Sequence, residues 1–241
     1  MSRQYTDEEA VFRKFRENSG QARQEVESAL RELIYEYSTS NRENRFVVGG
    51  AAEIIIAAAM RASGIDTDNL GHAGEGADLA TFVEAVGNRF SIKAVFSRKS
   101  STTRLVNFLG EGGGRQWSDP TLFVLPGIGI VLGHPGHTNL ASAVRVLADA
   151  LVMPLRAVRD HAAAHPELVI SLDFPFDPGT GRRVASVDVA RSILSKPHYP
   201  ILGRMLQPED PVDRLVKLEQ MLDRGHLTSE EFTAAKRRVL G

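Results

Sequence analysis

Two strand-like stretches decide the fold: LATFVEAV at residues 79–86 and RFSIKAVF at residues 89–96, which flank Gly87-Asn88. Both are rich in Val, Phe, Thr, Ile and other residues that favour strands. A two-residue connection that contains Gly between such stretches is typical of a tight turn. The sequence therefore predicts a β-hairpin that turns at Gly87-Asn88.

Two helices are expected before this hairpin. Apolar residues at three- and four-residue steps predict one amphipathic helix from Thr6 to about Tyr37. Thr6 and Glu9 have the spacing of a capping box. A second helix is predicted over about residues 49–62, GGAAEIIIAAAMRA, and Gly64 is expected to end it. That segment is apolar nearly all round, so we expect it to be buried.

The rest of the chain continues this mixture of strands and helices. We expect strands at 104–109, 121–133 and 167–174, and a helix at 141–165 that is broken near Pro154. The pattern predicts an α/β fold. The predicted segments are an N-terminal helix with its connection, a core, a linker and a C-terminal two-helix hairpin, at residues 1–44, 45–175, 176–209 and 210–241.

The composition restricts the possible chemistry. The chain has 241 residues, of which 42% are hydrophobic and 24% are charged, as in a globular protein with a large core. It contains no Cys, which excludes disulfides, thiol catalysis and iron–sulfur clusters. With 29 basic and 30 acidic residues, any nucleic-acid binding must depend on a local patch. Without a signal peptide or a membrane-spanning apolar stretch, we expect a cytoplasmic location and no membrane partner.

Three residues have the chemistry of a metal-dependent hydrolase. Glu53 is the one acid of the apolar helix, Asp78 precedes the first strand of the hairpin, and Lys93 lies on the second. Glu53 needs a partner, because burying an unpaired carboxylate is costly. Carboxylate oxygens are the ligands that Mg²⁺ prefers, and the lysine could position the attacking water.

The order of these residues resembles the motif of the PD-(D/E)XK nuclease superfamily, over about residues 45–135. That resemblance implies a restriction-endonuclease-like mixed sheet flanked by helices. It also implies Mg²⁺- or Mn²⁺-dependent cleavage of DNA or RNA, and a role in bacterial restriction or phage defence. The family's helix acid, metal-binding acid, backbone ligand and lysine would be Glu53, Asp78, the carbonyl of Ile92 and Lys93.

The chain departs from that motif at Ser91, which stands where the family has a second acid. Some restriction enzymes of the superfamily carry a serine there and supply the carboxylate from elsewhere. Three residues are candidates for that carboxylate, and we rank them in the order Glu53, Glu84 and Glu111.

The expected hairpin register conflicts with the nuclease interpretation. A turn at Gly87-Asn88 pairs Glu84 with Ser91, but it also places Asp78 opposite Ser97 and too far from Lys93. The nuclease interpretation therefore requires a longer loop or a bulge within the hairpin.

A basic run follows the hairpin. Arg98, Lys99 and Arg104 are interspersed with Ser and Thr, which suits a phosphate backbone. In the glycine-rich loop that follows, Arg115 could add a phosphate contact and Trp117 a stacking surface. In the alternative interpretation, the basic run is a solvated end of the hairpin and Trp117 is a core residue.

The histidines predict no site. His134 and His137 lie in GHPGHTN without a third ligand nearby in the sequence, and a polar loop is expected. His161 and His165 have the i,i+4 spacing of a zinc pair, but the Glu of the metalloprotease motif is missing. We expect both to be surface residues.

The last segment, LVKLEQMLDRGHLTSEEFTAAKRRVL at 215–240, reads as two helices joined by a turn. Its pattern of spaced Leu, a basic-Gly turn and T-x-E-E-F resembles the short C-terminal (SHOCT) domain. That resemblance implies oligomerisation or contact with a partner, and no catalysis.

Three hypotheses remain from the sequence. The first is a Mg²⁺-dependent DNA endonuclease that acts as a dimer or larger assembly. The second is a non-cleaving member of the fold that binds nucleic acid or serves as a subunit of a larger complex, which Ser91 favours. The third is an interaction scaffold in which the C-terminal hairpin matters most.

Overall fold

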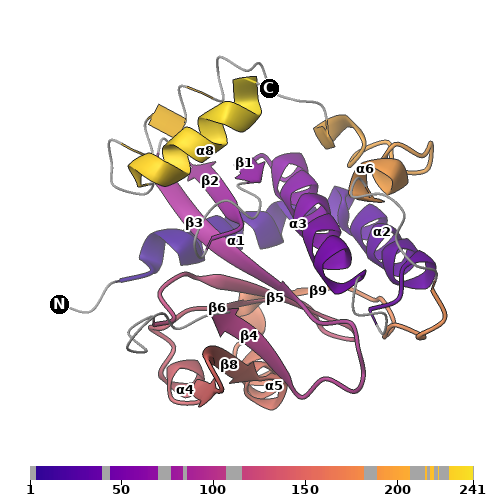
Figure 1. Ribbon diagram of the computed structural model, residues 1–241. Coiled ribbons are helices and arrows are strands. Elements are labelled where there is room, and N and C mark those ends of the chain that lie inside the picture. Colours follow the sequence, from indigo (N-terminus) through magenta and orange to yellow (C-terminus); the bar gives the residue numbers. More distant parts are fainter. Residues whose placement is uncertain are drawn as a thin grey trace.

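The computed structural model describes residues 4–39, 44–69, 77–83, 86–106, 116–181, 189–206, 215, 218, 219, 222 and 228–240. Figure 1 shows the arrangement of the elements. The helices are α1 (Thr6–Asn18), α2 (Arg23–Glu36), α3 (Asn44–Ala62), α4 (Thr138–Ala141), α5 (Leu155–Ala164), α6 (Val189–Leu194) and α8 (Ser229–Leu240). The strands are β1 (Asp66–Asn69), β2 (Leu79–Val83), β3 (Val86–Ala94), β4 (Thr102–Val106), β5 (Thr121–Leu125), β6 (Gly129–Gly133), β7 (Arg145–Leu147), β8 (Ala150–Pro154) and β9 (Val169–Ser171).

Six strands form the main sheet, in the order β1-β2-β3-β5-β6-β9. Neighbouring strands are antiparallel except β3 and β5, which are parallel. A smaller antiparallel sheet has the order β4-β8-β7. The predicted α/β class with a mixed sheet is therefore confirmed.

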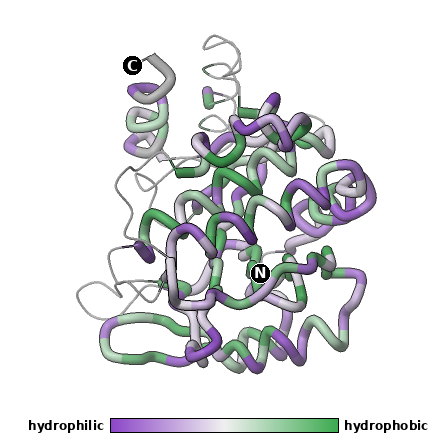
Figure 2. The backbone as a smooth tube through the Cα atoms, turned by 90° about the vertical axis from the view of Figure 1, so that its right-hand side faces the viewer, coloured by the Kyte–Doolittle hydropathy of each residue, from purple (hydrophilic) through white to green (hydrophobic). Residues whose placement is uncertain are grey.

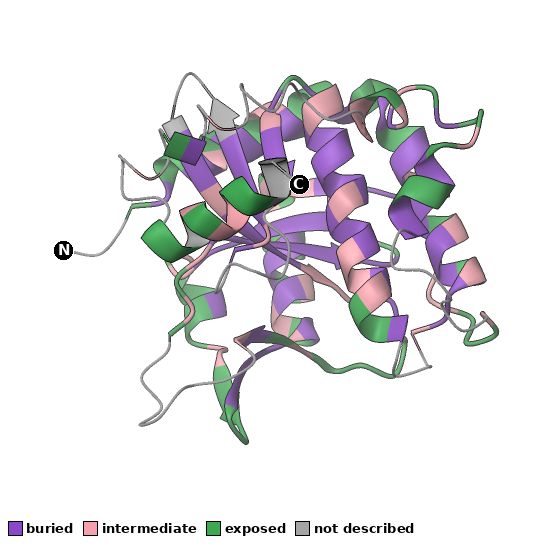
Figure 3. Cartoon of the chain, turned by 45° about the horizontal axis from the view of Figure 1, so that its top comes forward, coloured by how far each residue is buried: buried purple, intermediate pink, exposed green. Residues whose placement is uncertain are grey.

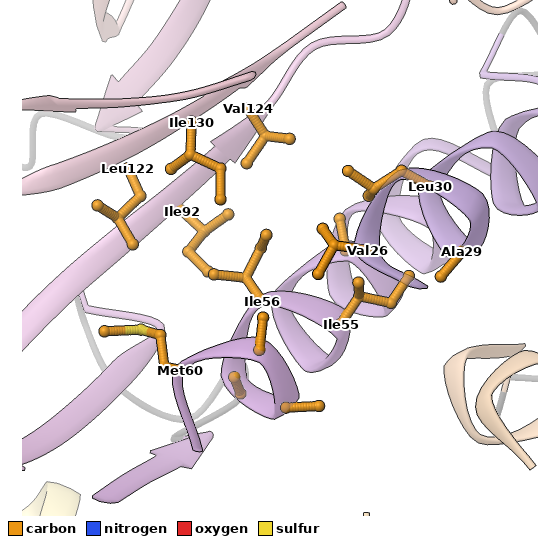
Figure 4. Close-up of a cluster of buried hydrophobic side chains, with 14 of the residues drawn as sticks. Val26, Ala29, Leu30, Ile55, Ile56, Met60, Ile92, Leu122, Val124 and Ile130 are labelled. Atoms are coloured by element: carbon orange, nitrogen blue, oxygen red, sulfur yellow. The ribbon is translucent and has the colours of Figure 1, made fainter. Parts of the chain in front are cut away.

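The largest core lies between α2, α3, α6 and one face of the main sheet. In Figure 4, Ile56 of α3 lies beside Ile92 of β3, with apolar residues of β5 and β6 next to them, and Ile55 lies beside Val26 of α2. The predicted burial of this helix is confirmed, since Ile55 and Ile56 are fully inaccessible to solvent. Burying a side chain of this size contributes roughly 1.5–3 kcal/mol.

A second core covers the opposite face of the main sheet. Side chains alternate along β5, so Leu122 and Val124 face the helices while Phe123 and Leu125 face the smaller sheet and α5. All five residues of β5 are buried, as expected of a strand with both faces covered. Figure 2 shows hydrophobic and hydrophilic residues interspersed along several of the helices, as in amphipathic helices.

The predicted β-hairpin is present, but its turn lies elsewhere. Val83 pairs with Val86, and Gly87-Asn88 lies within β3. The register expected from a turn at Gly87-Asn88 is therefore wrong. Pairing of a long β3 with β2 outweighs the local turn preference of Gly and Asn.

The N-terminal helical segment differs from its prediction in two ways. It is divided at Ser19–Gln21, a 3-10 turn between α1 and α2. Thr6 is the first residue of α1, and no side-chain cap hydrogen bond forms there. The carboxylate of Glu9 instead contacts His134 and His137. The next helix, α3, begins at Asn44, earlier than expected, and Gly64 follows its end with the positive φ of 73° that favours glycine.

The region after β4 was predicted least well. Residues 121–133 form two antiparallel strands, β5 and β6, rather than one, and β4 pairs with β8. The first part of the predicted helix at 141–165 is strand, in β7 and β8, and α5 begins directly after Pro154. The predicted late strand is present as the short β9.

The expected linker is only partly a connection. Within residues 176–209, α6 and the turn after it pack into the main core, where Ile193, Leu194 and Leu202 are buried. No helix among the described residues is long and apolar enough to cross a membrane.

The C-terminal segment packs on the outer end of the hairpin. Leu218 is buried against Ala77 and Ala80, and Phe232 and Ala235 of α8 pack on the same cluster. Figure 3 shows α8 in front of the strands with much of its surface exposed.

Candidate functional site

The observed register brings Asp78 beside Ser91. Leu79 pairs with Phe90, which places Asp78 opposite Ser91 when the pairing is continued by one residue. The backbone N–H of Asp78 donates to the carbonyl of Phe90 at 2.9 Å. No longer loop or bulge is required to bring Asp78 to the strand that carries Lys93.

The carboxylate of Asp78 is held by three groups of β3. The hydroxyl of Ser91 donates to Oδ2 at 3.0 Å, and the backbone N–H of Ile92 donates to the same oxygen at 2.5 Å. Nζ of Lys93 lies 3.7 Å from Oδ2. Alternation along β3 places Ser91 and Lys93 on one face, as the sequence predicts. The side chains of Asp78 and Lys93 are 16% and 20% exposed, so solvent reaches both.

Glu53 of α3 is close enough to Asp78 and Lys93 for their charges to shift its pKa. Its side chain is buried within a helix that is otherwise apolar on this side. Burial, and then the charge of Asp78, raises the pKa of Glu53 to about 8, while Lys93 acts in the opposite direction. At pH 7 the isolated site therefore favours a protonated Glu53.

Such a site suits a divalent cation. A carboxyl that keeps its proton because it is buried and near another carboxylate would lose that proton to solvent when a cation binds between the two acids. Carboxylate oxygens are the donors that Mg²⁺ and Mn²⁺ use. Glu53 and Asp78 are the residues that would hold the ion. The N–H of Ile92, rather than its carbonyl, makes the observed contact with Asp78.

Other predicted residues are separate from this cluster or outside the described residues. Glu84, Glu111 and Arg115 are outside the described residues. Arg98, Lys99 and Arg104 are exposed after β3 and on β4. The guanidinium of Arg98 lies 5.1 Å from the centre of the Phe176 ring. Trp117 packs against the second core and donates its indole N–H to the hydroxyl of Thr121 at 3.0 Å, which fits the core interpretation.

A cluster of histidines is the feature that the sequence analysis missed. His161, expected at the surface, is fully buried, and its ring lies between Asn139 and the carbonyl of Leu132. The rings of His134 and His137 stack with centroids 3.6 Å apart, and His137 lies 4.6 Å from His161.

The carboxylate of Glu9 is the third possible ligand beside His134 and His137. The sequence did not reveal it. It lies on α1, and only the fold brings it to the loop after β6. Burial, and then the neighbouring histidines, lowers the pKa of His137 to about 3, so its ring is neutral at pH 7.

Comparison with known proteins identifies one domain. Residues 213–240 match the model of the SHOCT family, the short C-terminal domain, which confirms that part of the sequence interpretation. No curated protein and no solved structure matches the chain.

Proposed function

We propose that the chain is a divalent-metal-dependent nuclease that hydrolyses phosphodiester bonds of DNA, on a restriction-endonuclease-like core. One observation carries the proposal: Lys93 of β3 forms an ion pair with Asp78 before β2, and the charges of both act on the buried Glu53 of α3. These are the residue types that metal-dependent phosphodiester hydrolysis requires.

Each residue has a role that follows from its position. Asp78 and Glu53 hold the cation, which when bound lowers the pKa of water and stabilises charge on the phosphate. Lys93 orients the attacking water or the scissile phosphate. Ser91 and the N–H of Ile92 fix the direction of the Asp78 carboxylate.

Glu53 takes the place of the missing second acid in this proposal. Ser91 cannot bind a metal as a carboxylate does, and its hydroxyl is already directed at Asp78. The charge of Asp78 raises the pKa of Glu53, whereas Glu84 lies outside the part of the chain that the structure describes, so Glu53 remains ahead of Glu84 as the completing ligand.

A non-cleaving role is the second candidate. Oδ2 of Asp78 already receives the hydroxyl of Ser91 and the N–H of Ile92, and the C-terminal segment packs on Ala77 and Ala80 on either side of it. Because protein groups already donate hydrogen bonds to Asp78, the site also fits a subunit that binds nucleic acid without cutting it.

Substrate binding and assembly are assigned to separate surfaces. The exposed Arg98, Lys99 and Arg104 would contact the phosphate backbone. The SHOCT domain would join copies of the chain, or join the chain to a partner protein. Cutting both strands of DNA requires such an assembly. A part in bacterial defence is the physiological role that we propose.

The test is cleavage of plasmid and linear DNA with Mg²⁺ or Mn²⁺. We expect the wild-type chain to cut and Asp78→Asn and Lys93→Met to be at least 100-fold slower. Asp160→Asn is the matched control, because Asp160 is exposed on α5 and pairs only with Arg156 among the contacts that the structure describes. It should cut like the wild type.

Three results would reject the nuclease proposal. Cutting that survives both site substitutions would come from a different site or a contaminant. DNA binding without cutting by any form would favour the non-cleaving subunit. Neither binding nor cutting would favour the interaction scaffold.

A further inference from the structure

Glu9, His134 and His137 place three metal-binding atoms close together, far from Asp78 in the chain. Oε1 of Glu9 lies 3.0 Å from Nε2 of His134 and 3.5 Å from Nε2 of His137. All three ligand atoms lie within 4.8 Å of one another. Glu9 comes from α1 and both histidines come from the loop between β6 and α4, so a shared ligand would join distant parts of the chain.

We propose that Glu9, His134 and His137 form a binding site for a divalent transition metal of the Zn²⁺ class. Two imidazole nitrogens and one carboxylate oxygen are donors that Zn²⁺ uses, whereas Mg²⁺ prefers oxygen alone. Bonds of 2.0–2.1 Å in a tetrahedron place neighbouring ligand atoms about 3.4 Å apart. The observed separations of 3.0 and 3.5 Å bracket that value. Water would take the fourth position.

The surroundings hold the first histidine in place. His134 is buried, and its ring stacks on Tyr5 with centroids 4.3 Å apart. The hydroxyl of Tyr5 donates to the carbonyl of Ser118 at 3.1 Å. A Cβ atom at Gly136 would lie 2.9 Å from Nδ1 of His134 and 3.2 Å from the ring of Tyr5, so the loop fits closely around both rings.

Metal binding requires a defined rearrangement of this cluster. Nδ1 of His134 accepts the N–H of Gly136 at 3.1 Å, and Nδ1 of His137 accepts the N–H of His134 at 3.3 Å. Each neutral ring therefore carries its proton on Nε2, directed at Glu9. When a metal binds Nε2, that proton moves to Nδ1 of the same ring, and the two backbone contacts open.

The stack of the two rings must open as well. Their planes are 27° apart with centroids 3.6 Å from each other, and a metal lies in the plane of each imidazole that binds it. We therefore expect metal binding to move residues 134–137 and to change the amide environment of Gly136. No net proton release is expected at neutral pH, because both protons stay on their rings.

The experiment titrates the metal-free full chain with ZnCl₂ in competition with a chromophoric chelator. We expect one Zn²⁺ per chain at this site, and at least tenfold weaker binding in Glu9→Gln and His137→Gln. The matched control is His165→Gln, whose ring lies 6.2 Å from that of His137 but outside the three ligands. It should bind as the wild type does.

Two measurements on the wild type do not depend on how the variants fold. Co²⁺ should give the visible absorption of a nitrogen- and oxygen-ligated site, and Zn²⁺ should shift the amide resonance of Gly136. Absence of stoichiometric Zn²⁺ binding, an unmoved Gly136 resonance, or equal loss of affinity in His165→Gln would overturn the proposal. Retained affinity in a folded Glu9→Gln would do the same.

Discussion

At the scale of single residues, Glu53 is the most informative side chain. A carboxyl buried in an apolar helix costs free energy unless a partner compensates it, and here the charge of Asp78 makes the cost larger. Binding and catalytic sites commonly retain such unfavourable arrangements, because the ligand relieves them. The raised pKa of Glu53 thus agrees with a role in binding a cation.

This arrangement predicts how pH affects the metal-free protein. The folded pKa of Glu53, about 8, exceeds the ordinary value of 4.5, so its contribution to stability is complete below pH 4.5 and is lost as pH rises through 8. Glu53→Gln does not ionise and should therefore be the more stable protein at neutral and higher pH, by about 1–3 kcal/mol.

Urea unfolding at pH 5, 7 and 9 in the presence of a chelator measures this effect. The advantage of Glu53→Gln should grow between pH 5 and 8 and then level off. Glu17→Gln, an exposed acid of α1, is the control and should show no such trend. An advantage that does not change with pH would mean that Glu53 is ionised and paired in the folded protein.

At the scale of elements, local sequence predicted which segments form strands better than it predicted their pairing. The sequence predicts the strand-forming stretches of β2 and β3, yet it predicts the turn at Gly87-Asn88 because those two residues suit turns, and the observed register differs. The observed register depends on cross-strand contacts that no local preference records. The same limit explains β7 and β8, where a run of helix-favouring residues forms strands because β4 lies beside β8.

The turn between β5 and β6 offers a sharp test of these elements. Gly129 has φ of 115° and lies so close to Ile170 and Leu172 that a Cβ atom would overlap their backbone. Gly129→Ala should therefore destabilise the protein by more than about 3 kcal/mol. Gly127→Ala is the matched control, because Gly127 also has positive φ, 71°, but open space around it.

Chemical denaturation of both variants measures the difference. Gly127→Ala should lose only about 1–2 kcal/mol, the usual cost of a left-handed backbone for a residue with a Cβ atom. Equal losses in the two variants would show that backbone strain alone, rather than the contact with β9, makes Gly129 necessary.

At the scale of the whole molecule, two acids of α2 join this helix to the segment after α6. Glu25 accepts the backbone N–H groups of Ile201 and Leu202 at 3.0 and 2.8 Å. Glu32 accepts the ammonium of Lys196 and the hydroxyl of Tyr199. These contacts explain why residues 189–206 form part of the core although their Pro-rich sequence suggests a linker. Their partners are more than 150 positions away, beyond any local pattern.

The contacts of Glu32 predict how low pH affects the stability of the protein. Burial acts to raise the pKa of Glu32, but the hydrogen bonds from Lys196 and Tyr199 outweigh it and lower that pKa below 4.5. The stability that Glu32 contributes is therefore present above pH 4.5 and lost as pH falls through its folded pKa. Glu32→Gln should be less stable by about 1–2 kcal/mol at pH 7, and its difference from the wild type should shrink toward pH 2. Thermal melts of the wild type and Glu32→Gln from pH 2 to pH 7 measure this difference in stability, with Glu17→Gln as the exposed control. A difference that stays constant with pH would mean that packing, rather than the charge of Glu32, holds residues 196–199 against α2.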